Sequence, residues 1–161
     1  YFSSMHDYDY FSLGYNWRMS SITAALGLSQ LDKIEKVIDM RRKNAKYYQS
    51  KLKKIKEITL QEEPLGFKHV YQFYPILLRN STIRTKLMNF LASKGIMTRI
   101  FFKPVHKTIF FRKIGYGSLS LSNTEKISKQ ILALPMFPTL RKDEINYIVG
   151  TITKFFEYMN K

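Results

Sequence analysis

Residues 13–19 read Leu13-Gly14-Tyr15-Asn16-Trp17-Arg18-Met19, and an amphipathic run opens directly after them at Ser20 and Ser21. The amide of Asn16, the guanidinium of Arg18 and the free N–H groups of a helix start therefore fall in one small region. All three kinds of group bind anions. The same residues also suit a plain helix start, in which a glycine turns the chain and Ser20 caps the helix. Taken alone, these residues favour the structural interpretation.

The run over residues 20–56 has the period of one long helix. Most of its lysines fall off the apolar stripe, as in a helix with one packed face. A helix of this length exceeds what one small domain needs to cover, so we expect it to bridge two layers or two domains. The apolar stripe consists of Ile22, Leu26, Leu31, Ile34, Ile38, Ala45, Tyr48 and Leu52.

Residues 1–19 are aromatic and polar with little periodicity, and we expect this segment to pack on another domain. The chain starts at Tyr1 without an initiator methionine, which indicates an excised part of a longer protein. Residues 57–161 alternate between helix and strand patterns, which predicts a small α/β sandwich. The predicted fold class is therefore α/β, of the α+β type, with a long helix in front of a small domain.

Within residues 57–161 the sequence predicts three strands and three helices. Pro75 cannot donate to a strand ladder, so its strand is expected at a sheet edge or a bulge. Glu125 stands three residues after Ser122, the spacing of a capping box. The predicted strands cover 70–78, 96–102 and a short edge strand within 132–138; the helices run from Ser81 or Thr82 to Gly95, from Ser122 to Gln130, and onward from Arg141 or Lys142, with 103–121 irregular.

Composition excludes several classes of protein. Hydrophobic residues make up 45% of the chain, which is ample for a core, and no apolar stretch approaches the roughly twenty residues that span a bilayer. We therefore expect a soluble, cytoplasmic chain. The absence of cysteine rules out disulfides and thiol catalysis. The histidines His6, His69 and His106 lack the spacing of a metal site, so we expect no metal.

The net charge of +15 admits more than one interpretation. Ten basic residues lie between Lys33 and Lys56 against the acids Glu35 and Asp39, and such a helix could bind nucleic acid or an anionic membrane surface. The favoured alternative is a solvated lysine-rich face, because no nucleic-acid motif accompanies the charge. A third alternative is that compensating acidic residues belong to a part of the protein outside this chain.

Four blocks together carry a family resemblance. Their order and spacing resemble the carboxyl-terminal half of the DegT/DnrJ/EryC1/StrS aminotransferases, pyridoxal-phosphate enzymes of nucleotide-sugar metabolism. The resemblance covers nearly the whole chain and implies the C-terminal domain of a fold-type I transferase. Residues 98–102 look like the subgroup of GDP-perosamine synthases, where two aromatics replace His-Tyr. The blocks are LGYNWRMSSITAALGLSQLDKI (13–34), HVYQFYPILL (69–78), LASKGIMTRIFFKPVH (91–106) and ILALPMFPTLRKDEINYI (131–148).

The resemblance implies roles for five residues. Asn16 would bind the phosphate of the neighbouring subunit's pyridoxal 5'-phosphate across a homodimer interface. Arg18 would contact the phosphates of the sugar nucleotide or brace that interface. Phe101 and Phe102 would line the sugar side of the pocket, and His106 would lie near the substrate. Without the family context, two phenylalanines at a strand end suit a core, and a lone histidine suits a structural hydrogen bond.

The family's catalytic residues do not fall within this chain. The lysine that forms the Schiff base, the acidic partner of the pyridine nitrogen and the aromatic stacked on the ring all lie upstream of the GYN block in the family. No catalytic residue is therefore assigned here, and the chain alone is expected to be inactive without its N-terminal large domain.

The complete enzyme is expected to aminate a nucleotide-linked 4-keto-6-deoxy sugar with glutamate, for surface polysaccharide synthesis. The sequence does not separate amination from pyridoxal-dependent dehydration. Two alternatives stay open: a non-catalytic stand-alone remnant or assembly module, and a basic nucleic-acid-binding domain, which is the less favoured of the two.

Overall fold

The computed structural model describes residues 14–15 and 17–159. The chain divides into two compact units, Tyr1–Ile34 and Glu35–Lys161. The first unit contains helix α1 (Ser21–Leu31), whose start is capped as expected, because the side chain of Ser20 accepts a hydrogen bond from the N–H of Thr23 at 3.2 Å. None of the residues of α1 is buried. The roles proposed for 1–19 and 20–56, packing on a further domain and bridging, stay predictions.

The single helix predicted over 20–56 is two helices, α1 and α2 (Ile34–Leu52). The break falls at Asp32 and Lys33, where the N–H of Lys33 bonds to the carbonyl of Gln30, three residues back, and closes the last turn of α1 tightly. The predicted C-terminus is also wrong: the chain turns after Leu52, and the N–H of Ile55 bonds to the carbonyl of Leu52. The apolar stripe continues from Leu31 to Ile34 and Ile38 across the first break, so the pattern alone does not reveal that break.

The second unit is built on a three-stranded antiparallel sheet. Its strands β1 (Thr59–Leu60), β2 (Tyr74–Leu77) and β3 (Ile131–Leu134) lie in the order β1-β2-β3. The short strand predicted within 132–138 is confirmed as edge strand β3, whereas β1 was not predicted. The strand predicted over 96–102 is wrong, because only Arg99 pairs there, through an isolated bridge with Ala133 on the outer edge of β3.

Pro75 lies on the central strand in continuous register with β3, and not at the predicted edge or bulge. Its partner in the register is Ala133, whose N–H and carbonyl are both bonded to Arg99 on the opposite side. In an antiparallel ladder the two main-chain groups of a residue point to the same neighbour, so the nitrogen of Pro75 faces away from β3. On that side β1 pairs only with Ile76 and Leu77. The proline therefore removes no ladder bond.

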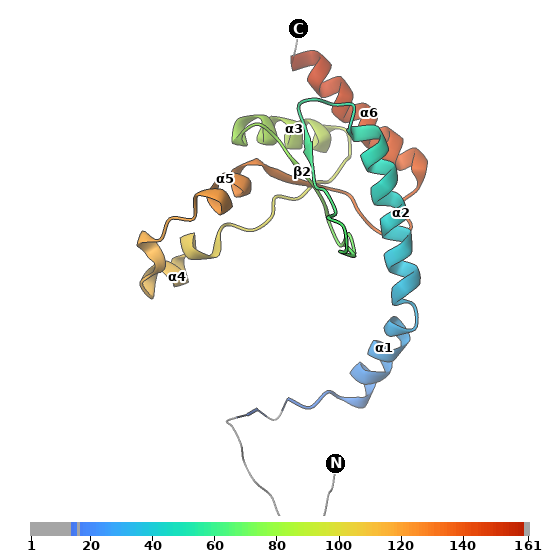
Figure 1. The fold of residues 1–161 in the computed structure, drawn as a ribbon, viewed down its shortest axis with the longest axis vertical. Helices are drawn as coiled ribbons and strands as arrows, with labels where there is room; N and C mark the ends of the chain where they lie inside the picture. Colours follow the sequence, from blue (N-terminus) through green and yellow to red (C-terminus); the bar gives the residue numbers. More distant parts are fainter. Residues whose placement is uncertain (1–13, 16, 160–161) are drawn as a thin grey trace, which may run out of the picture. The chain divides into compact units, whose positions relative to one another are not determined.

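Helices pack against one face of this sheet. Besides α2, these are α3 (Ser81–Ser93) and α6 (Lys142–Met159), both close to the predicted bounds. Figure 1 shows α6 beside α2, and the hydroxyl of Tyr47 donates to Asn146 at 2.9 Å between them. The segment predicted to be irregular, 103–121, contains three short helical pieces: η1 (Val105–Lys107), α4 (Ile109–Lys113) and η2 (Tyr116–Ser118).

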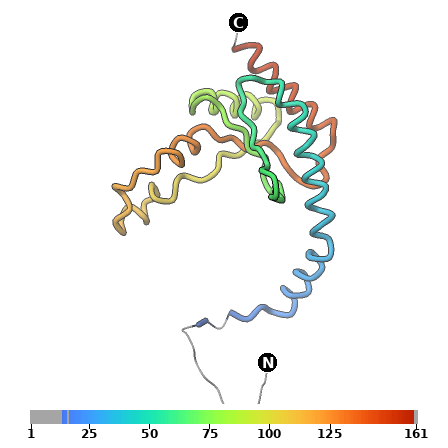
Figure 2. The backbone as a smooth tube through the Cα atoms, viewed as in Figure 1, coloured from blue at the N-terminus to red at the C-terminus, as the bar shows by residue number. Residues whose placement is uncertain are grey.

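Helix α5 (Ser122–Gln130) is confirmed, but its predicted capping box is only half formed. Glu125 accepts a hydrogen bond from the N–H of Leu121 at 3.1 Å, whereas Ser122 is already helical and caps nothing. In Figure 2, α5 lies beside the segment that carries η1, and His106 bonds to Glu125 between them.

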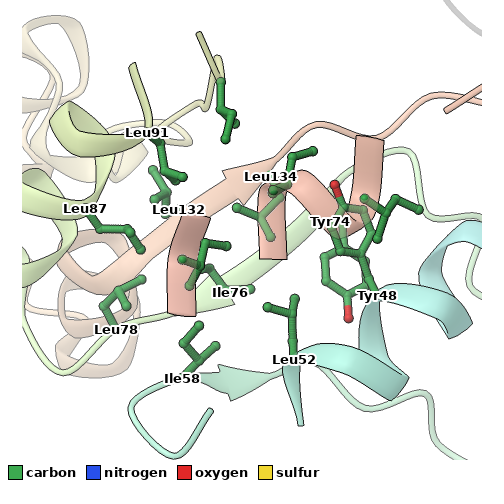
Figure 3. Close-up of a cluster of buried hydrophobic side chains, with 14 of the residues drawn as sticks. Tyr48, Leu52, Ile58, Tyr74, Ile76, Leu78, Leu87, Leu91, Leu132 and Leu134 are labelled. Atoms are coloured by element: carbon green, nitrogen blue, oxygen red, sulfur yellow. The ribbon is translucent and has the colours of Figure 1, made fainter. Parts of the chain in front are cut away.

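The core lies between the sheet and α2, α3 and α6, so the fold class is confirmed as α+β. Alternate residues of the paired strands, Tyr74 with Leu134 and Ile76 with Leu132, point to the same face, as the pleat requires. Figure 3 shows them meeting Leu52 of α2 and Leu87 of α3. The cluster also takes in buried residues of α6: Ile145, Ile148, Ile152, Phe155 and Phe156. These helices do not cover the opposite face of the sheet, which the hollows of the candidate site adjoin.

Candidate functional site

Two hollows of about 390 Å³ and about 300 Å³ adjoin the face of the sheet that α2, α3 and α6 leave open. Ala133 lines the larger one, and Pro75 and Ile131 line the smaller. Both hollows share the residues Gln72, Phe73 and Phe101. The larger hollow is called the arginine cavity below; its lining includes Arg41, Phe73, Arg99, Phe101, Met136 and Phe137.

An aromatic pair forms the wall that the two hollows share. The rings of Phe73 and Phe101 have centroids 4.3 Å apart at an interplanar angle of 58°, a favourable tilted contact. Phe101 follows two residues after Arg99, whose N–H and carbonyl are bonded to Ala133 at 3.1 and 2.8 Å. This double hydrogen bond fixes the main chain from which the ring projects, so the wall is anchored to β3.

Arg41 of α2 holds the main chain on two sides of the arginine cavity. Its Nη1 donates to the carbonyls of Tyr71 at 3.2 Å, Gln72 at 3.0 Å and Met136 at 3.2 Å. The first two carbonyls precede β2 and the third follows β3, so one guanidinium connects α2 with both strand ends. Hydrogen bonds from a charged donor are stronger than neutral ones, which suits this bracing role.

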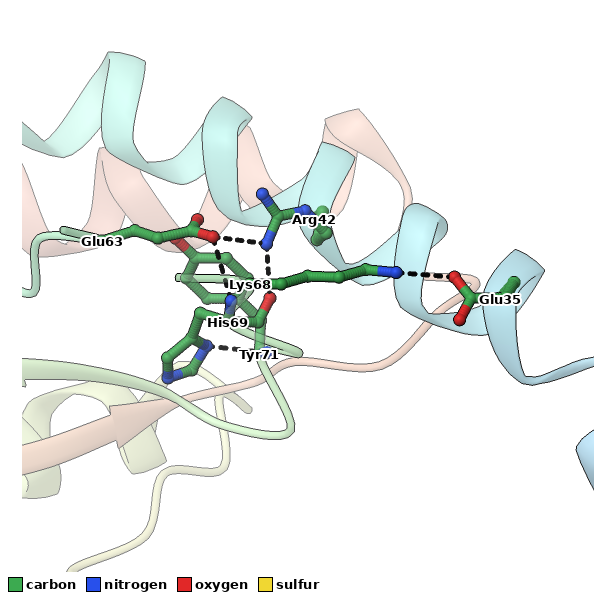
Figure 4. A network of polar contacts seen from close by, with 6 residues as sticks. All are labelled: Glu35, Arg42, Glu63, Lys68, His69 and Tyr71. Carbon is green, nitrogen blue, oxygen red and sulfur yellow. Dashed lines mark hydrogen bonds and ion pairs between the residues drawn. The ribbon is translucent and has the colours of Figure 1, made fainter. Parts of the chain in front are cut away.

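The neighbouring Arg42 holds the segment before β2, as Figure 4 shows. Its Nη1 donates to Glu63 Oε1 and to the carbonyl of His69, both at 2.7 Å. Glu63 also accepts from the N–H of His69 at 2.9 Å and from the hydroxyl of Tyr71 at 3.2 Å. These hydrogen bonds, above all the one from Arg42, lower the pKa of Glu63 to about 2, so the carboxylate is charged at neutral pH.

Tyr71 is held in a strained main-chain conformation by this network. Its φ of 46° lies in the left-handed region, which non-glycine residues rarely adopt. Its N–H donates to His69 Nδ1 at 2.8 Å, and burial raises the pKa of its hydroxyl. The strain turns the chain just before Gln72 and Phe73, two residues that line both hollows.

The charge of the arginine cavity is entirely positive. Arg41 and Arg99 line it, and no aspartate or glutamate is among the described residues that do so. Arg99 makes no side-chain hydrogen bond or ion pair within the part of the chain that the structure describes. Neither arginine was predicted from the sequence as a site residue. Arg41 was counted among the ten basic residues between Lys33 and Lys56, and Arg99 lies in the quoted block 91–106 and in the segment 98–102.

The predicted residues of the first unit are only partly described. Asn16 lies outside the described residues. Arg18 is exposed and makes no hydrogen bond or ion pair with any described residue, and Trp17 stacks on Tyr15 with centroids 5.1 Å apart. These residues belong to the first unit, and both hollows are lined by residues of the second.

The predicted residues of the second unit fall in two places. Phe101 lines both hollows, and Phe102 packs against it at 5.9 Å but is 84% exposed and lines neither of them. His106 is only 5% exposed, and its Nε2 lies 3.1 Å from Glu125 Oε1. Lys107 Nζ lies 3.3 Å from the same oxygen. The roles of these residues toward a substrate stay predictions.

Glu125 is the centre of the small network around His106. Its hydrogen bonds, first to His106 and then to the N–H of Leu121, lower its pKa to about 2. The network ties η1 to the start of α5 and accounts for the burial of His106 without any ligand. This contact corresponds to the structural hydrogen bond expected of a lone histidine.

The structure bears on two further classes of function. Among the described residues, no three His, Cys, Asp or Glu side chains gather as metal ligands would. Within residues 14–15 and 17–159, every helix is too short or too polar to cross a bilayer.

Comparison with known proteins adds evidence over almost the whole chain. Residues 1–153 match the model of the DegT/DnrJ/EryC1/StrS aminotransferase family. GDP-perosamine synthase of Escherichia coli O157:H7 is 32% identical over 144 residues, which make up 89% of this chain and 38% of that protein. The UDP-4-amino-4,6-dideoxy-N-acetyl-beta-L-altrosamine transaminase of Campylobacter jejuni serotype O:2 is 26% identical over 160 residues, or 96% of this chain and 42% of that protein.

The fold of this chain is also similar to that of a solved aminotransferase structure. Helicobacter pylori PseC, an aminotransferase involved in the biosynthesis of pseudoaminic acid, superposes with a TM-score of 0.80 at 25% identity, covering 97% of this chain and 42% of that one. The chain thus spans about two fifths of the length of the proteins it matches. The resemblance predicted from the four sequence blocks is confirmed, and the chain belongs to the DegT/DnrJ/EryC1/StrS aminotransferase family.

Proposed function

We propose that this chain is the carboxyl-terminal part of a pyridoxal-phosphate aminotransferase that moves the amino group of glutamate to a nucleotide-linked 4-keto-6-deoxy sugar, for surface polysaccharide synthesis. The observation that carries the proposal is the family match over residues 1–153. The names of the relatives, a GDP-sugar synthase and a UDP-sugar transaminase, support a nucleotide sugar as the acceptor.

The residues around the start of α1 suit phosphate groups. Arg18 is exposed and its guanidinium is unpaired among the described residues, so it would contact the phosphates of the sugar nucleotide bidentately or brace the dimer interface. Asn16 would add a neutral amide donor to the neighbouring subunit's cofactor. When bound, pyridoxal phosphate supplies the electron sink that lets an amino group leave one substrate and enter another. Such sharing requires a homodimer.

The second unit would contribute walls to a substrate pocket. Phe73 and Phe101 present a hydrophobic surface against which a sugar ring or a substrate carbon chain can pack, with water excluded from the reacting region. Arg41 and Arg42 would position those walls through the main chain. Phe102 would line the sugar side of the pocket, and His106 would lie near the substrate.

The nucleic-acid alternative is not favoured. Two of the ten basic residues between Lys33 and Lys56, Arg41 and Arg42, are engaged with main-chain carbonyls and Glu63 and are not available to a phosphate backbone. Dehydration of the sugar in place of amination remains an outcome of the test below.

The experiment starts upstream of Tyr1. The in-frame protein that contains this chain would be purified, and its product from glutamate and a 4-keto-6-deoxy nucleotide sugar identified by mass spectrometry. An amino sugar and 2-oxoglutarate support the proposal, and a dehydrated sugar contradicts it. A coding sequence that begins at or just before Tyr1 would point instead to an assembly module.

A variant tests the shared phosphate site. Asn16→Ala in the complete protein should weaken cofactor binding about tenfold, measured by the absorbance of the bound cofactor, because one hydrogen bond to a charged group is lost. Asn89→Ala is the matched control, since Asn89 is an exposed residue of α3. Equal cofactor affinity in both variants would remove Asn16 from the site.

A further inference from the structure

We propose that the arginine cavity binds a carboxylate, with Arg99 as the residue that contacts it, and that the ligand is a short dicarboxylate such as the amino donor. The identity of the ligand as amino donor rests on the proposed function; the carboxylate site itself does not. The cavity, of about 390 Å³, lies within the size range of small-molecule sites.

The charge of the cavity selects an anion. Arg41 and Arg99 line it without any acidic residue among the described lining, and much of the rest is apolar: Phe73, Met97, Phe101 and Phe137. A positive charge beside apolar walls attracts an anion more strongly than the same charge in open water, because the local dielectric constant is lower. The apolar walls would contact the carbon chain of the ligand.

The two arginines have different tasks. Arg41 is committed to three main-chain carbonyls through Nη1, so it shapes the cavity and contributes charge. Arg99 is fixed only through its main chain, by two hydrogen bonds to Ala133, and its guanidinium is unpaired among the described residues. Its planar fork of donors is therefore available for a bidentate contact, on a rigid support that lowers the cost of ordering it.

One feature favours a carboxylate over a phosphate, since the planar fork of a guanidinium can pair with two oxygens of either group. Phosphate sites commonly use the free N–H groups of a helix N-terminus, and none of the described lining residues lies in the first turn of a helix. Arg41 lies within α2, and Arg99 lies outside any helix.

Calorimetric titration of the 161-residue chain with glutarate at constant ionic strength tests the site. We expect saturable binding that weakens at least tenfold in Arg99→Gln and by a smaller factor in Arg99→Lys, which keeps the charge but loses the fork. Arg79→Gln is the matched control, because Arg79 is also exposed but lines a different hollow, beside Lys56 and Lys126. Circular dichroism checks that each variant is folded.

Three outcomes would overturn the proposal. Arg99→Gln binds glutarate as well as the parent does; or Arg79→Gln weakens binding equally, which indicates general attraction to a chain of net charge +15; or inorganic phosphate binds in an Arg99-dependent way and glutarate does not. The third outcome would assign the cavity to the phosphates of the nucleotide sugar.

Kinetics of the complete protein separate this inference from the proposed function. Arg99→Gln should raise the KM for glutamate about tenfold and leave the KM for the nucleotide sugar unchanged. An active enzyme with an unchanged KM for glutamate would contradict the carboxylate site alone. Arg99-dependent glutarate binding by a protein without transaminase activity would contradict the proposed function alone.

Discussion

Glu63 connects the segment before β2 to α2 through its charge. Its pKa of about 2 in the folded protein lies below the ordinary value of 4.5, chiefly because of the hydrogen bond from Arg42. A lowered pKa stabilises the fold above the ordinary value, and that stability is lost as the pH falls from about 5 to about 2. Glu63→Gln should therefore unfold at lower urea concentration than the parent at pH 7, with the difference vanishing near pH 2.

Glu157→Gln is the control for Glu63, because Glu157 is exposed and makes no hydrogen bond or ion pair with the described residues. Its urea midpoint should follow the parent at every pH. Equal midpoints for Glu63→Gln and the parent at pH 7 would mean that the charge of Glu63 adds nothing to the fold.

At the scale of the elements, Gly95 ends α3 as the sequence predicted. Its φ is 73°, its N–H bonds to Ala92, and the N–H of Ile96 bonds back to Leu91, the pattern of a Schellman motif. A Cβ at Gly95 would meet no atom within 4 Å, so the cost of alanine there is conformational alone. Gly95→Ala should lower the free energy of unfolding by about 1–2 kcal/mol in urea titrations.

Gly150 gives a control of opposite sign. It lies inside α6, is exposed, and an added Cβ would also meet nothing within 4 Å. Gly150→Ala should raise the free energy of unfolding by about 0.5–1 kcal/mol, because alanine favours the helix. Two substitutions that both destabilise, or both stabilise, would contradict this account.

The helices that pack on one face were predictable from the sequence, and the strands were less so. The stripe of α6 is set locally, and its residues Ile145, Ile148 and Ile152 are buried as predicted. Pairing of a strand depends on distant residues. The segment 96–102 has a strand pattern, but only Arg99 finds a partner, Ala133 of β3. In that antiparallel register Pro135 stands opposite Met97 and has no N–H to donate, whereas nothing in the sequence explains why residues 100–102 stay unpaired.

At the scale of the whole molecule, the family was predictable and the arginine cavity was not. Four blocks in order identify the family, because each block is a continuous stretch of sequence whose resemblance is visible without the fold. The cavity joins α2, the segment before β2, residues 97–101 and the segment after β3. Arg41 and Arg99 become neighbours of one cavity only when the sheet forms, so no local pattern marks them as a pair.

The distribution of buried residues predicts which part of the chain sets its stability. All buried hydrophobic residues of the described part lie between Ala45 and Phe156, and α1 buries none although it contains Ile22, Leu26 and Leu31. Deleting residues 1–34 should therefore shift the Tm by less than about 4 °C, a shift that corresponds to under 1 kcal/mol.

Hydrogen exchange tests the same division from the other side. An eleven-residue helix is marginal on its own, so amides of α1 should exchange far faster than those of α2 in the 161-residue chain. In the complete aminotransferase, the exposed Ile22 and Leu26 would be covered by the large domain or the second subunit, and α1 should become protected. Rapid exchange of α1 in the complete protein as well would contradict its proposed role in joining this chain to the rest of the enzyme.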